Sequence, residues 1–207
     1  MKFLKSNYKR KVGVTTTPGL YIELKEPQWY LDEYDVDIVQ EVYDGLAEHG
    51  LETIQKATDA GIPIIIQSFN ADALIRFSQI SDLPLVQLMH HGIEFPDYPY
   101  DLDYVATYAH GVGPDSKTIM WYPSTEQVDF DLESESLFVQ KSHALNLQVH
   151  PYTLRDDDLQ WTANAADETA LYYTKGVDGI FTEFVSSTFG VFQTLWEQEQ
   201  QSQQCMQ

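Results

Sequence analysis

The sequence predicts an α/β fold built on a parallel sheet, and three observations lead to this expectation. Short apolar runs alternate with longer amphipathic segments along most of the chain. The apolar runs are continuous, which is typical of strands buried on both faces. The 207 residues are 43% hydrophobic, which is enough for one domain with a substantial core. Regular alternation of strand and helix favours a doubly wound sheet or a (β/α) barrel.

Six strand-like runs and six helix-like segments follow one another in order. The expected strands cover residues 20–24, 62–67, 85–88, 111–113, 147–150 and 179–182. The expected helices cover residues 37–50, 71–80, 103–110, 133–145, 167–175 and 189–199. Two of these helices stop at a glycine, Gly50 and Gly176, the residue type that most often follows a helix. Residues 196–207 are polar and rich in glutamine, so we expect a disordered tail there.

The number of strand-helix units bears on which sheet architecture forms. A closed (β/α)8 barrel needs eight units and about 250 residues, and the sequence shows six. Because the order already ends in a helix and a polar tail, we expect the first two units to be missing before residue 1. Residues 1–195 would then form an incomplete TIM (β/α)8-type barrel of about six units. A six-unit open sheet is the alternative, and in either case open sheet edges invite self-association.

Charge and cysteine content exclude several classes of function. The formal net charge is −20, from 32 acidic and 12 basic residues. Such a surface repels nucleic acids and anionic lipids, so we expect no nucleic-acid partner. The single cysteine, Cys205, provides neither a disulfide nor a Cys-based metal site. No stretch approaches the ~20 apolar residues of a membrane span, and the charged N-terminus lacks the apolar core of a signal peptide, which leaves the compartment open.

The most informative local feature is a pair of opposite charges at the end of the first strand-like run. Glu23 and Lys25 lie two residues apart, so in a strand their side chains point to the same face. At the carboxyl end of a buried strand, this pair could bind a metal cation and a phosphate. An ordinary salt bridge at a strand edge is the alternative, since exposed ion pairs are common and contribute only ~0–1 kcal/mol.

Polar and aromatic residues recur after the other expected strands, where parallel sheets bind their ligands. They are Gln67, Phe69, Gln87, the pair His90-His91, Tyr152, Arg155 and Trp161. Either glutamine could instead satisfy backbone groups of neighbouring loops. The adjacent histidines would point in opposite directions in an extended segment, which disfavours a shared metal. Tyr152 and Trp161 could floor a glycerol pocket or pack in the core, and Arg155 could be neutralised by the acidic residues that follow it.

Taken together, these segments resemble the glycerophosphodiester phosphodiesterase family. The stretch from Tyr21 to Pro27 is similar to the family's Glu-x-Lys-x-Pro strand, and residues 67–74 are similar to its next strand and helix start. Residues 85–88, 111–114, 150–155 and 176–184 follow in the family's order. No single motif is decisive, but six in order over residues 12–195 are specific.

The resemblance implies a TIM barrel that hydrolyses glycerophosphodiesters to an alcohol and glycerol 3-phosphate with a divalent cation, Ca²⁺ or Mg²⁺. By position, it implies that Glu23 is a metal ligand and that Lys25 is the catalytic lysine that approaches the phosphate. It also implies substrate-binding roles for four rim residues. These are Gln67, Phe69, Tyr152 and Trp161.

The departures from the family pattern are as informative as the matches. The family's His-Arg and Glu-Asn-Thr motifs and its His-Asp pair do not occur in this chain. One glutamate does not make a Ca²⁺ site, because that ion takes six to eight oxygen ligands. We therefore expect the chain alone to be a truncated, weakly active or inactive copy of a phosphodiesterase. A non-enzymatic binding module derived from the barrel, and an unrelated barrel enzyme of sugar metabolism, are the alternatives.

Overall fold

The chain divides into two compact units in the computed structural model, which describes residues 18–90, 101–120 and 136–205. The N-terminal unit comprises Met1–Leu88 and Tyr104–Gly111. The C-terminal unit comprises Met89–Asp103 and Val112–Gln207.

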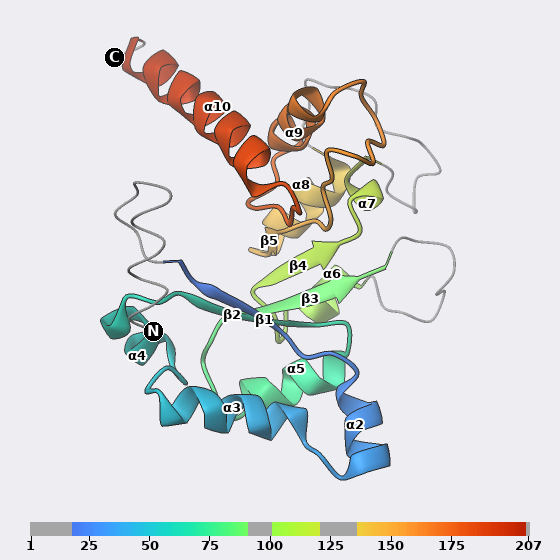
Figure 1. Cartoon of the computed structure of the whole chain (residues 1–207), viewed down its shortest axis with the longest axis vertical. Coiled ribbons are helices and arrows are strands. Elements are labelled where there is room, and N and C mark those ends of the chain that lie inside the picture. The colour runs from blue at the N-terminus through green and yellow to red at the C-terminus, as the bar shows by residue number, and fades with distance from the viewer. Residues whose placement is uncertain (1–17, 91–100, 121–135, 206–207) are drawn as a thin grey trace. The chain divides into compact units, whose positions relative to one another are not determined.

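The described residues contain five strands, which are neighbours in the order β1-β2-β3-β4-β5, the same as their order in the sequence (Figure 1). Their bounds are Leu20–Glu23 for β1, Ile64–Ser68 for β2, Leu85–Met89 for β3, Gly111–Pro114 for β4 and Gln148–Val149 for β5. β1 pairs with β2, and β2 with β3, in parallel. The predicted α/β class is therefore confirmed, and five strands are fewer than the eight of a closed barrel.

Nine helices lie in the described parts of the chain. They are α2 (Pro27–Tyr34), α3 (Ile38–Glu48), α4 (Ile54–Ala60), α5 (Ala71–Ser78), α6 (Leu102–Val105), α7 (Lys117–Met120), α8 (Leu137–Ala144), α9 (Ala165–Thr174) and α10 (Val185–Cys205). None of these helices is long and apolar enough to cross a lipid bilayer, as judged over the described residues.

In the N-terminal unit, α3 and α5 contact each other on the same side of β1 and β2 (Figure 1). Their apolar residues recur at helical spacing, so each helix buries one face. α3 buries Val39 and Leu46, and α5 buries Leu74 and Phe77, neither of which has accessible surface. The two helices thus pack on one side of these strands, and the polar groups considered below lie at the carboxyl ends of the strands.

Capping residues fix the ends of the helices that follow the strands. Asn70 accepts a hydrogen bond from the Ala73 N–H at 2.9 Å, which makes it the predicted N-cap of α5. Gly50 and Gly176 have φ angles of 64° and 84°, a left-handed conformation that costs glycine little. The two predicted glycine stops are thus confirmed.

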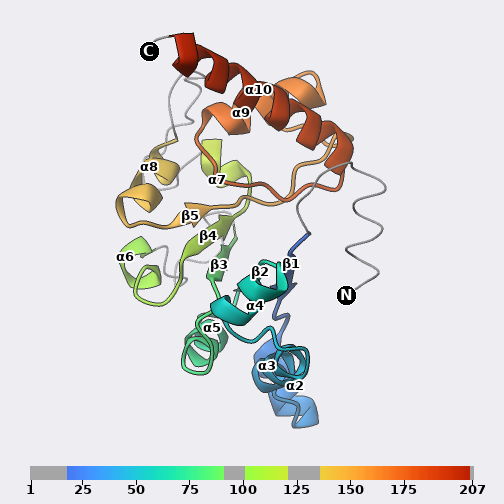
Figure 2. The same cartoon turned by 90° about the vertical axis from the view of Figure 1, so that its left-hand side faces the viewer.

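In the C-terminal unit, α9 and α10 pack side by side (Figure 2). The rings of Tyr173 and Phe192 meet edge to face, with centroids 5.4 Å apart. The residues of β4 are all buried, as the continuous apolar run predicts. The loop that follows β5 carries the polar residues considered below.

Three expectations about local structure were wrong. Residues 179–182 form no strand, because their pairing with the segment after β5 is limited to one isolated bridge, Leu154 with Thr182. The tail expected to be disordered continues α10 as far as Cys205. The helix expected at residues 103–110 is only the short α6, and α2, α4 and α7 had no clear apolar periodicity and were not predicted.

Candidate functional site

The carboxyl end of β1 presents the predicted ion pair. Glu23 is the last residue of β1, and its Oε2 lies 3.5 Å from the Nζ of Lys25. The Glu23 side chain is 26% exposed and that of Lys25 is 73% exposed. Leu24, between them, is buried, so the chain alternates as an extended segment should. The expectation that Glu23 and Lys25 share a face is confirmed, while their roles in binding stay predictions.

Gln67 lies beside Glu23, because the two residues are register partners on β2 and β1. The Gln67 side chain is buried, with 6% of its surface accessible. Its Oε1 has no hydrogen-bond partner among the residues that the structure describes. A buried polar atom without a partner costs about 1–3 kcal/mol, so this oxygen is a candidate contact for a ligand.

Gln87 behaves in the opposite way and has a structural role. Its Nε2 donates to the backbone oxygens of Ser68, Phe69 and Leu88 at 3.2, 3.1 and 2.9 Å. Its Oε1 accepts from the Tyr108 hydroxyl at 2.8 Å. Of the two readings left open by the sequence, satisfaction of loop backbone groups is therefore correct for Gln87.

Ser68 ties the loops of this rim together. It is fully buried, and its hydroxyl donates to the Leu24 carbonyl at 2.8 Å. The same oxygen accepts from the Asn70 N–H at 3.1 Å. Phe69, predicted to bind substrate, lies between them and is half-buried. The backbone before Lys25 is thus fixed to the carboxyl end of β2.

The rim of the C-terminal unit is built around Tyr152 and Asp115, which form a parallel bridge after β4 and β5. The Tyr152 hydroxyl donates to the Met89 carbonyl at 2.9 Å. The Tyr152 carbonyl accepts from the Ser116 N–H at 2.7 Å. Tyr152 is half-buried, so part of its ring is accessible to a ligand while its hydroxyl has a structural partner.

Arg155 is committed to two carboxylates, as its acidic surroundings suggested. Its guanidinium donates to Asp157 at 3.0 and 3.1 Å and to the Glu183 carboxylate at 2.7 Å. The hydrogen bond from Arg155 lowers the pKa of Asp157. The arginine therefore joins the loop after β5 to the segment before α10.

A small polar cavity of about 160 Å³ lies at this rim. The residues that line it include Asp115, Lys117, Tyr152, Arg155, Glu168 and Tyr172. Trp161, predicted to bind substrate, is half-buried nearby in sequence, and its Nε1 donates to the Tyr172 hydroxyl at 3.1 Å. Burial raises the pKa of Tyr172 to about 12, so the phenol is neutral.

The sequence did not point to Glu168 and Tyr172. Both lie on α9 and are buried, with 1% and 0% of their surfaces accessible. From the sequence, a glutamate in the first turn of a helix is ordinarily interpreted as a negative charge that stabilises the helix N-terminus. In the folded chain, however, Glu168 accepts hydrogen bonds from the backbone N–H groups of residues 160–162, in the loop before α9.

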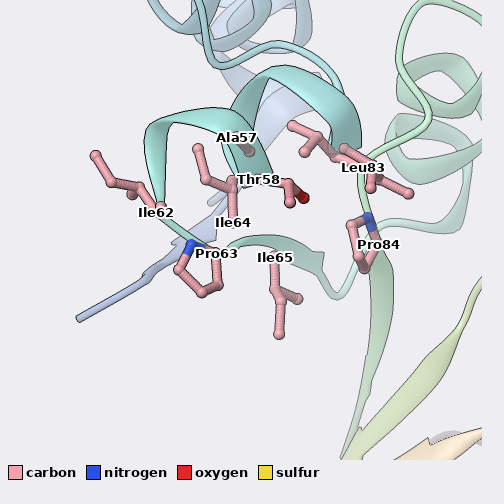
Figure 3. A pocket seen from close by; sticks show the side chains of 10 residues that line it. Ala57, Thr58, Ile62, Pro63, Ile64, Ile65, Leu83 and Pro84 are labelled. Carbon is pink, nitrogen blue, oxygen red and sulfur yellow. The ribbon is translucent and has the colours of Figure 1, made fainter. Parts of the chain in front are cut away.

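A larger cavity of about 600 Å³ lies in the N-terminal unit, at the amino ends of β2 and β3 (Figure 3). Its lining is mainly apolar, with Ile62, Pro63, Ile64, Leu83 and Pro84 among the contributors. Because Glu23 and Gln67 lie at the opposite, carboxyl ends of the strands, this cavity holds none of the candidate residues. Volume alone therefore does not identify the functional site.

The described residues provide only part of a site for the divalent cation that the resemblance implies. Glu23 and the unsatisfied Oε1 of Gln67 are oxygen donors of the kind that hard cations prefer. Over the described residues, however, no three His, Cys, Asp or Glu side chains cluster to hold a metal ion. His90 is exposed, and His91 falls outside the described residues.

Comparisons with known proteins agree on one family. The family model for the glycerophosphoryl diester phosphodiesterase family matches residues 9–187. The chain is 32% identical over 140 residues to the glycerophosphodiester phosphodiesterase GDPD6 of Arabidopsis thaliana, covering 60% of this chain and 36% of that protein. It is 30% identical over 170 residues to the glycerophosphodiester phosphodiesterase of Bacillus subtilis, covering 79% and 45%.

A solved structure supports the fold. A protein of Silicibacter pomeroyi, assigned as a glycerophosphoryl diester phosphodiesterase, superposes with a TM-score of 0.61 at 19% identity, covering 94% of this chain and 55% of that protein. The chain thus spans about a third to a half of the curated relatives that it matches. With the family model matching most of the sequence, the chain belongs to the glycerophosphoryl diester phosphodiesterase family.

Proposed function

We propose that this protein takes part in the hydrolysis of glycerophosphodiesters to an alcohol and glycerol 3-phosphate. The observation that carries the proposal is the Glu23–Lys25 pair, 3.5 Å apart at the carboxyl end of β1 and next to the unsatisfied Gln67 Oε1. The family match over residues 9–187 supports it. This end of a parallel sheet is where barrel enzymes carry out their chemistry.

The two charged residues have distinct roles in the proposed reaction. Hydrolysis adds water across the phosphodiester bond and concentrates negative charge on the phosphoryl oxygens. The Lys25 ammonium is 73% exposed at the rim and can approach those oxygens. Glu23 offers its carboxylate to a cation, and its ion pair with Lys25 keeps both side chains on one face.

The substrate contacts are proposed on two rims. In the N-terminal unit, Gln67 and Phe69 are the proposed substrate contacts of the rim that carries Glu23 and Lys25. Considered separately, the rim of the C-terminal unit would offer the aromatic surface of Tyr152 and Trp161 to a glycerol or head group. Both aromatic side chains are half-buried and have hydrogen-bonded polar ends, so their rings are held in place.

Members of the family generally use a divalent cation, and we propose Ca²⁺ or Mg²⁺ for this protein. When bound, such an ion neutralises charge that builds up on the phosphoryl oxygens. Glu23 and Gln67 would contribute two of its oxygen ligands. Because Ca²⁺ takes six to eight oxygen ligands, these two residues would not be enough to hold the ion tightly, and we expect the 207-residue chain to be weakly active or inactive.

Release of glycerol 3-phosphate from glycerophosphocholine by the purified chain, with Ca²⁺, Mg²⁺ or EDTA, tests the proposal. Activity that needs a cation and is lost in Glu23→Gln would support it. If the chain has no activity, calorimetric titration with glycerophosphocholine in the presence of each cation separates a weak enzyme from a protein without the site. The proposal would be overturned if the chain showed no turnover and also no binding of glycerophosphocholine.

A binding module that lacks catalysis is the second candidate. The observation that favours it is the sequence itself, in which the family's His-Arg and Glu-Asn-Thr motifs do not occur. Such a protein would bind glycerophosphodiesters without hydrolysing them. Binding by calorimetry with no released glycerol 3-phosphate after prolonged incubation would favour this candidate, and measurable hydrolysis would exclude it.

We also propose that the chain self-associates through exposed strand edges. β1 pairs with β2 and comes at the end of the strand order of the described residues, and an edge strand of this kind can pair with another chain. Light scattering over a range of concentrations tests this. A mass that stays at 23.8 kDa would contradict it.

A further inference from the structure

One buried carboxylate in the C-terminal unit holds three consecutive backbone N–H groups. The Oε1 of Glu168 accepts from the Gln160 N–H at 2.9 Å. Its Oε2 accepts from the N–H groups of Trp161 at 2.9 Å and Thr162 at 3.1 Å. Only 1% of the Glu168 surface is accessible, so these contacts replace its hydration.

The N–H groups of three consecutive residues converge on the two carboxylate oxygens of Glu168. Hydrogen bonds from N–H groups to a carboxylate are charge-assisted and about twice as strong as neutral ones. Successive N–H groups that converge on one point form a concave anion site. Glu168 also lies in the first turn of the ten-residue helix α9, where a negative charge is favourable. The bend at residues 160–162 therefore depends on this carboxylate.

The bend fixes the position of Trp161. Glu168 holds its backbone N–H, and the Tyr172 hydroxyl accepts from its indole Nε1 at 3.1 Å. Tyr172 is fully buried, and its hydroxyl is 3.4 Å from the Ser116 carbonyl, to which it donates. Trp161 is thus held at both its backbone and its ring, next to a polar cavity that Gln160, Glu168 and Tyr172 help to line.

We propose that Glu168 is a positioning residue, which sets the orientation of Trp161 and thereby the affinity of this rim for the glycerol or head-group part of a glycerophosphodiester. The inference deepens the proposed function and rests on it for the identity of the ligand. Glu168 itself need not touch the ligand. It acts through the backbone of residues 160–162, while Trp161 supplies the contact surface.

The test compares Glu168→Gln with the wild-type chain. The amide keeps the size of the side chain but replaces one acceptor oxygen with a donor group that opposes the N–H groups. Acrylamide quenching of tryptophan fluorescence reports on the indole, and repeating each measurement with Trp161→Phe isolates the Trp161 signal from the other three tryptophans. We expect Trp161 to lose its protection in Glu168→Gln.

The same variants are titrated with glycerophosphocholine by calorimetry, at a temperature where circular dichroism shows each to be folded. We expect Glu168→Gln and Trp161→Phe to weaken binding to a similar extent, about tenfold for the loss of one ordered aromatic contact. Glu197→Gln, an exposed substitution of the same type on α10, is the control and should change neither quenching nor binding. A merely structural role for Glu168 would lower the unfolding temperature but leave the affinity of folded protein unchanged.

The outcomes separate this inference from the proposed function. Unchanged Trp161 quenching in Glu168→Gln, or unchanged affinity where the wild type binds, would overturn the inference. If the wild-type chain binds no glycerophosphocholine, the proposed function fails, while the quenching still decides whether Glu168 positions Trp161. If Glu168→Gln does not fold, Tyr172→Phe removes the acceptor of the indole and should also expose Trp161, and protection retained there would overturn the inference.

Discussion

Glu23 and Gln67 are register partners on the parallel strands β1 and β2, and both present oxygen acceptors on the same face. Gln67 is buried with its Oε1 unsatisfied, and Glu23 is partly exposed. Two neighbouring acceptors are favourable only when a cation or a donor lies between or beside them. Lys25 supplies one such cation to Glu23, at 3.5 Å. This pairing of oxygen acceptors is the observation on which the proposed cation contact of Glu23 and Gln67 rests.

Removing the charge of Glu23 should abolish most of any cation-dependent turnover. In Glu23→Gln the side chain keeps its size but loses the negative charge that attracts the ion. We expect a loss on the order of 10²–10³ in kcat/KM, the range seen when one electrostatic contact to the transition state is removed. Glu26→Gln, an exposed substitution three residues further along, is the matched control and should behave as wild type. An unchanged cation affinity in Glu23→Gln would contradict the assignment.

Replacing Gln67 with leucine should stabilise the protein and weaken ligand binding. The substitution removes a buried oxygen without a partner, whose desolvation costs about 1–3 kcal/mol. We expect the free energy of unfolding in urea to rise by about 1 kcal/mol, while the affinity for glycerophosphocholine falls. A gain in stability at the expense of binding is the signature of a functional polar group.

Gln87→Leu is the matched comparison, because the same change removes a fully satisfied amide. It would leave three backbone carbonyls and the Tyr108 hydroxyl without this partner. We expect the free energy of unfolding to fall by about 2–3 kcal/mol. Equal effects of the two substitutions would show that Gln67 is structural as well.

Acidification should destabilise the C-terminal unit through His150. Burial lowers the pKa of His150 below its usual 6.5, and the nearby Asp178 opposes this only in part. As the pH falls through 6.5, the unfolded state takes up a proton that the folded state does not yet bind, so the free energy of unfolding decreases. Thermal unfolding of the wild type and His150→Asn between pH 7.5 and 5.5 measures the effect.

His150→Asn should lose less stability than the wild type over this pH range. The other ionisable groups here, His143 and Asp178, are hydrogen-bonded to each other at 3.0 Å and are present in both proteins, so their contribution cancels to first order. His49→Asn, which changes an exposed histidine at the end of α3, serves as the control. A pH dependence that is identical in all three proteins would contradict the prediction.

Asp37 should contribute to stability mainly as a helix cap. Its side chain accepts from the Val39 and Gln40 N–H groups at 3.1 and 3.4 Å and also pairs with Arg76 of α5. Asp37→Asn keeps an acceptor for the cap and loses the exposed ion pair, so we expect a cost of at most ~1 kcal/mol. Asp37→Ala loses both and should cost about 1 kcal/mol more in urea unfolding. Equal costs would assign the effect to the ion pair.

The sequence by itself determined the alternation of strands and helices, the family resemblance and the shared face of Glu23 and Lys25. These depend on short-range patterns. Continuous apolar runs indicate burial on both faces, a left-handed backbone position such as that of Gly50 favours glycine, and residues two apart in a strand point the same way. The run at residues 179–182 failed because a strand also needs a continuous partner, which local composition does not supply.

Only the tertiary structure decided which of the polar residues are satisfied. Gln67 and Gln87 look alike in sequence. Within the described residues, the Gln67 Oε1 lacks a hydrogen-bond partner, whereas Gln87 donates to the carbonyls of Ser68, Phe69 and Leu88. Glu168 reads as an ordinary helix-start acid until the loop before α9 folds back and places three N–H groups around it. The physical reason is that hydrogen bonds between residues distant in sequence depend on how the segments are brought together in space, which the local pattern does not encode.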